Sequence, residues 1–311
     1  MTEPIGFVIL SHADPGQLGR LVDRLNRLYD RPPIAIHHDF YQSKVETDRF
    51  SGNVAFVSPS IRTRWAHISV VHAAQAALRL LYRDASPAWF TLLSGADYPV
   101  MRGEAVVADL AGAAFDLYLD HQKIERRPLP LPGPALSRMG TDAVDWRRRM
   151  YDRYIAHEWR YPSLTRRLKP THRRIVFRNE LVRAPFVPFG KDRSCHAGDH
   201  WFTGTAAVAE VLLEAEARQG DLFAYFATRF CPEEAIYHTI LGNRPDLRIC
   251  KDNRRYTNWA GQDSHPREIA PDDLPIIERQ RCHFARKFSS TGSQPVLAEI
   301  DRHLGLEPPS P

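Results

Sequence analysis

Short apolar runs and amphipathic stretches alternate along the first part of the chain. Residues 6–10 form an apolar run that is typical of a buried strand. The next stretch, which ends near Tyr29, repeats leucine and valine at helical spacing. Asp14 suits the N-cap of this helix, and Gln17 would complete a capping box. Residues 34–37 are apolar again, so the pattern predicts a β-α-β unit.

The alternation of apolar runs and amphipathic stretches continues over most of the chain. Further strands are expected at 54–57, 89–93, 115–119 and 201–203, and further helices at 69–82, 144–160, 205–219 and 295–304. Residues 185–198 read as irregular. Strands that alternate with helices predict an α/β fold, with a central sheet flanked by helices. No repeat or sharp boundary divides the chain, so a single domain over 1–311 is expected.

Polar residues follow several of these strands. His12 follows the first strand, Asp39 the second, and Ser94 and Asp97 the strand that ends near residue 93. Open α/β sheets bind ligands at the carboxyl ends of their strands, so these side chains are candidates for binding a nucleotide or a sugar. Asp97 follows Gly95, and it either binds a hydroxyl of a ligand or caps its own turn.

The sequence offers little to hold a metal ion. His37, His38 and Asp39 are adjacent, but no other cluster of histidine and acidic residues has ligand spacing. No aspartate is followed two positions later by another, which excludes the Asp-x-Asp arrangement of many metal-dependent sugar transferases. We therefore expect no metal and no other cofactor.

Two segments near the C-terminus carry candidate chemistry. Arg286 and Lys287 lie between two phenylalanines, an arrangement in which apolar flanks anchor cationic heads that suit a diphosphate. It also fits a basic pair on the surface. Glu233 and Glu234 follow Pro232 at an expected helix start, where the helix N-terminus stabilises carboxylates. They are candidates for a general base, or they are ordinary helix-start residues.

Positive charge is concentrated in the middle of the chain. The formal net charge is +5, but residues 121–193 alone carry +11 and the rest carries −6. Such a segment faces an anionic partner, or it contains a solvated, arginine-rich helix. Arg149 and Arg153 share one face of the expected helix, so both are candidates for binding an anionic acceptor. A basic nucleic-acid-binding protein is the remote alternative, although no known nucleic-acid-binding motif is present.

Composition places the protein among globular chains. Hydrophobic residues make up 43% of the sequence, and no apolar run reaches eighteen residues. The N-terminus lacks the features of a signal peptide, and the four cysteines are scattered without a CxxC pair. We expect a cytoplasmic protein with reduced thiols, in peripheral contact with the inner face of the membrane.

Read in order, several motifs resemble the core-2/I-branching β-1,6-N-acetylglucosaminyltransferase family, which includes the peptide O-xylosyltransferases. The matching segments span nearly the whole chain except 121–193. They are 7–12 (FVILSH), 34–39 (IAIHHD), 64–71 (RWAHISVV), 90–99 (FTLLSGADYP), 198–202 (GDHWF), 232–234 (PEE), 255–259 (RYTNW), 265–266 (HP) and 284–288 (FARKF).

The resemblance implies a GT-A-like, Rossmann-type nucleotide-sugar transferase fold, a UDP-sugar donor, inversion at the anomeric carbon and no metal. It divides the chain into a nucleotide-binding half at 1–120, a basic variable insertion at 121–193 and a catalytic and acceptor half at 194–311. The expected reaction transfers N-acetylglucosamine to a hydroxyl of a glycan, free or lipid-linked. A UDP-xylose-dependent enzyme on the same scaffold is the alternative.

The resemblance also implies residue roles. Glu234 is the expected catalytic base, and Lys287 is expected to bind the diphosphate, with Arg286 or Arg267 beside it. The other expected nucleotide-sugar contacts are His12, Asp39, Arg64, Trp65, Ser94 and Asp97. The acceptor is expected to meet Arg149, Arg153, Trp201, Tyr256 and Trp259.

Overall fold

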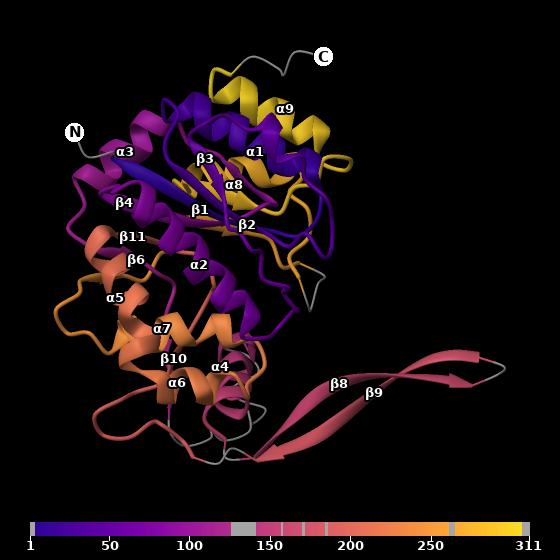
Figure 1. Cartoon of the computed structure of the whole chain (residues 1–311). Coiled ribbons are helices and arrows are strands. Elements are labelled where there is room, and N and C mark those ends of the chain that lie inside the picture. Colours follow the sequence, from indigo (N-terminus) through magenta and orange to yellow (C-terminus); the bar gives the residue numbers. More distant parts are fainter. Residues whose placement is uncertain are drawn as a thin grey trace.

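A seven-stranded mixed sheet lies at the centre of the computed structural model (Figure 1). The structure describes residues 4–125, 141–156, 158–169, 172–183, 186–260 and 265–306. The strands follow the order β12-β6-β11-β4-β1-β2-β3. Their bounds are β1 (Ile5–Ser11), β2 (Ile34–His38), β3 (Val54–Phe56), β4 (Trp89–Ser94), β6 (Leu117–Tyr118), β11 (Thr203–Thr205) and β12 (Ile249–Cys250). The expected α/β class with a central mixed sheet is confirmed.

The strand directions bring one set of loops to one edge of this sheet. β1 is parallel to both β2 and β4, so their carboxyl ends lie together. β11 runs antiparallel to β4 and β6, while β12 is parallel to β6. The residues that precede β11 and those that follow β6 and β12 therefore lie at the same edge as the ends of β1, β2 and β4. Ligand sites of open α/β sheets occupy this edge.

Alternating residues of the central strands are buried on opposite faces of the sheet. Ile5, Phe7 and Ile9 of β1 pack with helices α1 and α3, whereas Val8 packs with α2 and α5. Successive side chains of a strand point to opposite faces, so a strand covered on both sides is apolar throughout. The flanking helices are α1 (Pro15–Leu28), α2 (Ser69–Asp84), α3 (Gly103–Ala111) and α5 (Ala206–Arg218).

A second, three-stranded sheet has the order β13-β14-β5 and packs over a separate apolar cluster with two C-terminal helices. Its strands are β5 (Asp97–Pro99), β13 (Arg255–Thr257) and β14 (Phe284–Arg286), and the helices are α8 (Leu274–Gln280) and α9 (Gln294–His303). β14 pairs with both neighbours and lies opposite Asp97, so segments nearly 190 residues apart in sequence share this sheet.

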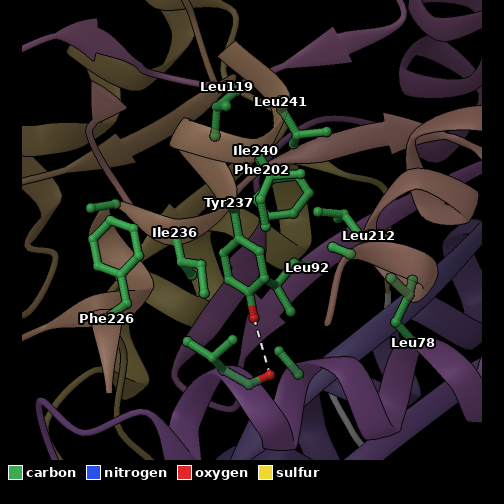
Figure 2. Close-up of a cluster of buried hydrophobic side chains, with 14 of the residues drawn as sticks. Leu78, Leu92, Leu119, Phe202, Leu212, Phe226, Ile236, Tyr237, Ile240 and Leu241 are labelled. Carbon is green, nitrogen blue, oxygen red and sulfur yellow. Dashed lines mark hydrogen bonds between the residues drawn. The ribbon is translucent and has the colours of Figure 1, made fainter. Parts of the chain in front are cut away.

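Helix α7 (Ile236–Gly242) anchors the candidate catalytic turn in the larger core. Figure 2 shows Tyr237, Ile236 and Ile240 among Leu92, Phe202 and other apolar side chains. The hydroxyl of Tyr237 donates a hydrogen bond of 3.2 Å to the carbonyl oxygen of Val71 in α2. Burying an aromatic ring with its hydroxyl paired stabilises the element that carries it. The turn just before α7 is therefore held at a defined position.

The remaining elements lie between these layers or beside them. They are β7 (Gln122–Lys123), β10 (His196–Ala197), α4 (Thr141–Tyr154), α6 (Gly220–Phe226) and the short 3₁₀ turns at Thr47–Arg49, Pro232–Glu234 and Pro271–Asp273. β8 (Glu158–Lys169) and β9 (His172–Arg183) form an antiparallel hairpin that extends away from the rest of the molecule (Figure 1).

Several local expectations need correction. The Asp14 side chain caps α1 by accepting from the Gln17 amide at 3.1 Å, but no capping box forms, because the Gln17 side chain donates to the carbonyl of Asp97. The helix expected at 144–160 ends at Tyr154, and the hairpin that follows was not predicted. The strand expected at 201–203 lies two residues later, where its amides find partners on β4 and β6.

Candidate active site

The loops after β1, β2 and β4 meet through a short hydrogen-bonded bridge. The Ser11 hydroxyl lies 3.2 Å from Nδ1 of His38, and the amide of Asp39 donates to the carbonyl of Ser11 at 2.8 Å. Gly95 donates to the carbonyl of Leu10, and a Cβ at Gly95 would lie only 3.0 Å from the Ser11 hydroxyl. Glycine at position 95 therefore allows the β4 turn to approach β1 closely.

Asp39 organises the loop after β3. Its carboxylate accepts hydrogen bonds from the amides of Tyr41 and Thr63, from the hydroxyl of Thr63 and from the side chain of Gln42, at 2.6–3.0 Å. Burial opposes ionisation, but these hydrogen bonds outweigh it and lower the pKa of Asp39 to about 2. The carboxylate therefore stays charged and holds Thr63, next to Arg64 and Trp65, in place.

His37 and His38 have partners within the protein. Nε2 of His37 accepts from the amide of Ile61 at 2.9 Å, and Nε2 of His38 lies 2.9 Å from the carbonyl of Ser43. Burial lowers the pKa of both imidazoles, so they stay neutral near pH 7. Across the described part of the chain, no three His, Cys, Asp or Glu side chains group as a metal site would need. His12 is exposed after β1, and its carbonyl accepts from Ser43.

Trp65 lies beside the candidate catalytic turn. Its ring is 67% exposed and packs edge-on against Phe230 at a centroid distance of 5.0 Å. The amide of Cys231 donates to the carbonyl of Ala66, which ties the two loops together. Arg64 next to it is exposed. The structure therefore brings Trp65 toward the turn that carries Glu234.

Asp97 is completely buried and is held by two arginines. Its Oδ2 accepts from Arg255, whose side chain is also buried, and from the amide of Ser94 at 3.1 Å. Its Oδ1 lies 3.1 Å from Nε of Arg286. The Ser94 hydroxyl accepts from the amide of Ala96, completing a tight turn. Within this geometry, Asp97 positions Arg286 at the edge of the sheet.

Arg286 and Lys287 lie where the sequence pattern predicts a diphosphate site. Phe284 and Phe288 on either side are buried, as expected for anchors. The guanidinium carbon of Arg286 lies 4.7 Å from the centre of the Trp201 ring, within the range of a cation–π interaction. Nζ of Lys287 lies 3.4 Å from Nδ1 of His265. The two adjacent cations therefore have different partners, Trp201 and Asp97 for Arg286 and His265 for Lys287.

Glu233 and Glu234 lie on the 3₁₀ turn Pro232–Glu234, not in the helix that follows it. An oxygen of Glu234 accepts from Nη1 of Arg153 at 2.7 Å. Burial raises the pKa of Glu234, while the positive charge of Arg153 opposes that rise. Burial and the neighbouring charge of Glu234 raise the pKa of Glu233 to about 8, so Glu233 is protonated at neutral pH. The same turn therefore presents two acids with different electrostatic surroundings, because only Glu234 has a cation bonded to its carboxylate.

One short segment joins the glutamate turn to the cations. The amide of Gly198 donates to the carbonyl of Glu234 at 2.9 Å, and Trp201, three residues later, underlies Arg286. Asp199 between them is buried, which raises its pKa, while the charges of Arg286 and Arg255 oppose that rise. Asp199 accepts from the side chain of Asn253 at 2.9 Å. The carboxylates and cations therefore belong to one continuous site.

The residues assigned to acceptor binding divide between two places. Tyr256 is buried, and its hydroxyl donates to Asp273, which also accepts from Arg267 and Asn258 at 2.7–2.8 Å. Trp259, one residue after Asn258, is 51% exposed. Arg153 instead lies at the glutamate turn and Trp201 lies against Arg286, whereas Arg149 is exposed on α4.

Three residues of the site received no role in the sequence analysis. Asp199 and Arg255 stand within segments that match the family motifs, but only the fold shows that they meet Asp97 and Arg286. Asp120 follows β6 at the same edge, and burial together with the charge of Asp199 raises its pKa to about 6. An aspartate directly after an expected strand was the available signal for Asp120.

Comparison with known families agrees with this geometry. Residues 5–127 match the model of the family described as "Branch: Core-2/I-Branching enzyme". This segment of the chain is therefore similar to the Core-2/I-branching enzyme family. The matched segment contains the ends of β1, β2 and β4, and therefore Ser11, Asp39 and Asp97.

Curated proteins extend the similarity beyond that segment. The chain is 26% identical to xylosyltransferase 2 of Rattus norvegicus and of Mus musculus, and also to the human protein, with 98% of this chain aligned in each case. The alignment covers 34% of each relative, so the chain spans about a third of their length. This distant similarity is to proteins named as xylosyltransferases, and it extends over nearly the whole of this chain. Among the described helices, none is both long and apolar enough to cross a bilayer.

Proposed function

We propose that this protein transfers a sugar from a UDP-sugar to a hydroxyl of a glycan, with inversion at the anomeric carbon. The observation that carries the proposal is the segment from Gly198 to Trp201, which joins the backbone of Glu234, whose side chain is the proposed base, to the cation Arg286. A base on one side of a reacting carbon and cations on the other are the groups that a single in-line displacement requires.

In the proposed reaction, the acceptor oxygen attacks C1 of the donor sugar. Glu234 takes the proton of the acceptor hydroxyl, the bond between C1 and the phosphate oxygen breaks, and UDP leaves with the bonding electrons. Glu234 suits this role because Arg153 favours its ionised form and because 37% of its side chain is exposed to an incoming acceptor. Glu233 is unsuited, since its raised pKa keeps it protonated.

The departing diphosphate is proposed to interact with Arg286 and Lys287 in place of a metal ion. Asp97 forms an ion pair with Arg286, so the cation is in position before the reaction begins. Fixed charges of this kind stabilise a developing anion without having to reorganise. Arg267 is tied to Asp273 and is assigned a supporting place near His265 and Lys287.

N-acetylglucosamine and xylose remain the two donor sugars under consideration. The family motifs favour the first, and the relatives, which are named as xylosyltransferases, favour the second. Both donors carry the same UDP group, so Ser94, Asp39 and His12 at the strand ends are proposed to serve either one. The sugar is proposed to lie between Trp201 and Trp65, near Asp199.

An anionic acceptor is proposed because cations approach the glutamate turn from α4. Arg153 reaches Glu234, and Arg149 lies one helical turn earlier on the same helix. Exposed Trp259 offers a ring face to a sugar of the acceptor. A glycan that carries acidic groups or a lipid diphosphate fits this combination, as does a location in the cytoplasm at the inner face of the membrane.

A UDP-release assay tests the proposal directly. UDP-N-acetylglucosamine, UDP-xylose, UDP-glucose and UDP-galactose are incubated with the protein and with Glu234→Gln, with and without EDTA. We expect UDP release from one donor above the others, unchanged by EDTA and lost in the variant. No release from any donor together with no UDP binding by calorimetry would contradict the proposal. Strict dependence on manganese or magnesium would contradict its metal-free form.

A further inference from the structure

The hairpin of β8 (Glu158–Lys169) and β9 (His172–Arg183), called the arm below, contacts the globular body at its base. Each strand has 12 residues, which corresponds to an extension of about 40 Å. Figure 1 shows it leaving the body without another element alongside. An isolated two-stranded ribbon is only marginally stable, and among the strands that the structure describes none pairs with either edge of this one. Such an arm gains stability from a partner surface.

Both ends of the arm are tied to one buried tyrosine. The hydroxyl of Tyr225 donates to the carbonyl of Tyr154, just before the arm, at 2.6 Å. The same ring contacts Phe186 and Phe189, just after the arm, at centroid distances of 5.8 and 5.5 Å. Arg229 adds a hydrogen bond of 2.9 Å to the carbonyl of Ala156. The arm therefore leaves the body from a fixed base.

Charge is distributed unevenly along the arm. Its two acidic residues, Glu158 and Glu180, occupy positions in the half nearest the body. The outer half contains only cationic charges, contributed by Arg166, Arg167, Lys169, Arg173 and Arg174. Arg167 and Arg174 are directly opposite in the register, and like charges in that position destabilise a strand pair. An anionic surface would remove this repulsion.

Apolar positions are interleaved with these cations. On one face, the register pairs Leu164 with Phe177, Arg166 with Ile175, and Leu168 with Arg173. Polyanions such as nucleic acids offer phosphates but no apolar phase for such residues. A bilayer with anionic headgroups offers both, because cations are attracted to the headgroups and apolar groups enter the boundary beneath them.

We propose that the β8–β9 arm docks the protein on an anionic phospholipid bilayer through its outer, cationic half. The arm begins close to the candidate base, since Arg153 in the last turn of α4 contacts Glu234 and β8 starts at residue 158. Docking would hold the active site near the bilayer, within reach of a lipid-linked acceptor. That last consequence rests on the proposed function, whereas the docking itself does not.

Vesicle sedimentation tests the docking. The protein is mixed with vesicles of phosphatidylcholine alone or with one quarter phosphatidylglycerol, at 50, 150 and 500 mM NaCl. We expect binding to the anionic vesicles only, weakening as salt rises. In the variant Arg166→Gln/Arg167→Gln/Arg173→Gln/Arg174→Gln, the partition coefficient should fall at least ~100-fold, because each cation near such a surface contributes roughly fivefold.

Matched controls separate docking from other effects. The first control neutralises four exposed arginines outside the arm, at positions 79, 218, 279 and 302. It removes the same charge, and most of the binding to anionic vesicles should remain. Replacing the four arm arginines by lysine should preserve vesicle binding, because the attraction to anionic headgroups depends on the charge. UDP affinity, measured by calorimetry, should be equal in all variants, so failure of docking and failure of the proposed enzymatic function are distinguishable.

Three results would overturn the proposal. Equal vesicle binding by the arm variant and the wild type would show that the arm is not the docking surface. Tighter binding of the wild type to single-stranded RNA than to anionic vesicles at equal salt would make it a nucleic-acid-binding arm. Light scattering could also detect a dimer that does not bind vesicles and that is lost in the arm variant. The arm would then be a contact between two copies of this chain.

Discussion

Nη1 of Arg153 lies 2.7 Å from a carboxylate oxygen of Glu234, although 81 residues separate the two in sequence. The contact joins the basic middle segment to the turn that carries the candidate base. Tyr154 supports it, because its hydroxyl donates to the carbonyl of Cys231 at 2.6 Å. The end of α4 therefore belongs to the candidate active site, and its Arg153 influences the pKa of Glu234.

Replacing Arg153 by glutamine should change the pH dependence of turnover. Burial raises the pKa of Glu234 and Arg153 opposes that rise, so removing the guanidinium should raise the pKa further. The acid limb of kcat should move to higher pH, with activity retained at alkaline pH, and Arg153→Lys should restore much of the original profile. Arg79→Gln, on the exposed side of α2, is the control. A uniform loss at every pH would indicate a merely structural role for Arg153.

Glu234 and Glu233 should respond differently to the same substitution. Glu234→Gln removes the proposed base, so turnover should fall roughly a hundredfold or more while UDP binding is kept. Glu233→Gln should cost little, because Glu233 has a pKa of about 8 and is already a neutral acid at pH 7. Steady-state kinetics and calorimetry check both. Near-full activity in Glu234→Gln with none in Glu233→Gln would reverse the assignment.

Glu233 should also make stability depend on pH. Its folded-state pKa of about 8 lies above the ordinary glutamate value of 4.5, so the folded protein binds more protons than the unfolded chain between those values. Stability from this group should therefore fall as pH rises from 4.5 to 8. Between pH 5 and pH 8.5, the Tm of Glu233→Gln should decrease less than the Tm of the wild type. Parallel curves for the two proteins would contradict the raised pKa.

Lys287 is expected to bind the donor diphosphate. A charge-assisted hydrogen bond to phosphate contributes about 1.5–3 kcal/mol, so Lys287→Ala should weaken UDP affinity roughly ten- to a hundredfold. Turnover should fall with it. Lys191→Ala, at an exposed position far along the sequence, is the matched control. Unchanged UDP affinity in calorimetry would leave Lys287 as an ordinary surface cation.

Asp97 should matter to stability as well as to the site. Its carboxylate and the guanidinium of Arg255 are both buried, and removing one partner of such a pair typically costs about 3–5 kcal/mol. Asp97→Ala should therefore lower the free energy of unfolding by that amount in denaturant titrations. Asp252→Ala, which removes the exposed partner of Arg254, should change it by less than about 1 kcal/mol. Similar effects of the two substitutions would contradict the structural role of the Asp97 pair.

Local patterning was sufficient to predict the frame of the site. The apolar runs before His12, Asp39 and Ser94 predicted strands, and they form β1, β2 and β4. The three strands are parallel, so their carboxyl ends share one edge of the sheet, as the expected β-α-β arrangement requires. Phe284 and Phe288 were expected to be buried around Arg286 and Lys287, and this is confirmed.

Long-range pairing was beyond the reach of such patterns. The hairpin was not predicted because cations and apolar residues mix within each strand, which leaves no clear period-2 alternation. Asp97 offered a choice between a ligand contact and a turn cap. Only the pairing of β5 with β14, and of β14 with β13, brings Arg255 and Arg286 to it.

The sequence by itself determined which residue types stand at the strand ends and which segments are apolar, because these depend on short-range periodicity. The tertiary structure alone decided the electrostatic surroundings of each acid. Glu233 and Glu234 are adjacent and chemically identical, yet burial leaves one neutral, while a guanidinium from another element favours the ionised form of the other. A pKa depends on desolvation and on charges brought within a few ångströms, and only folding creates those surroundings.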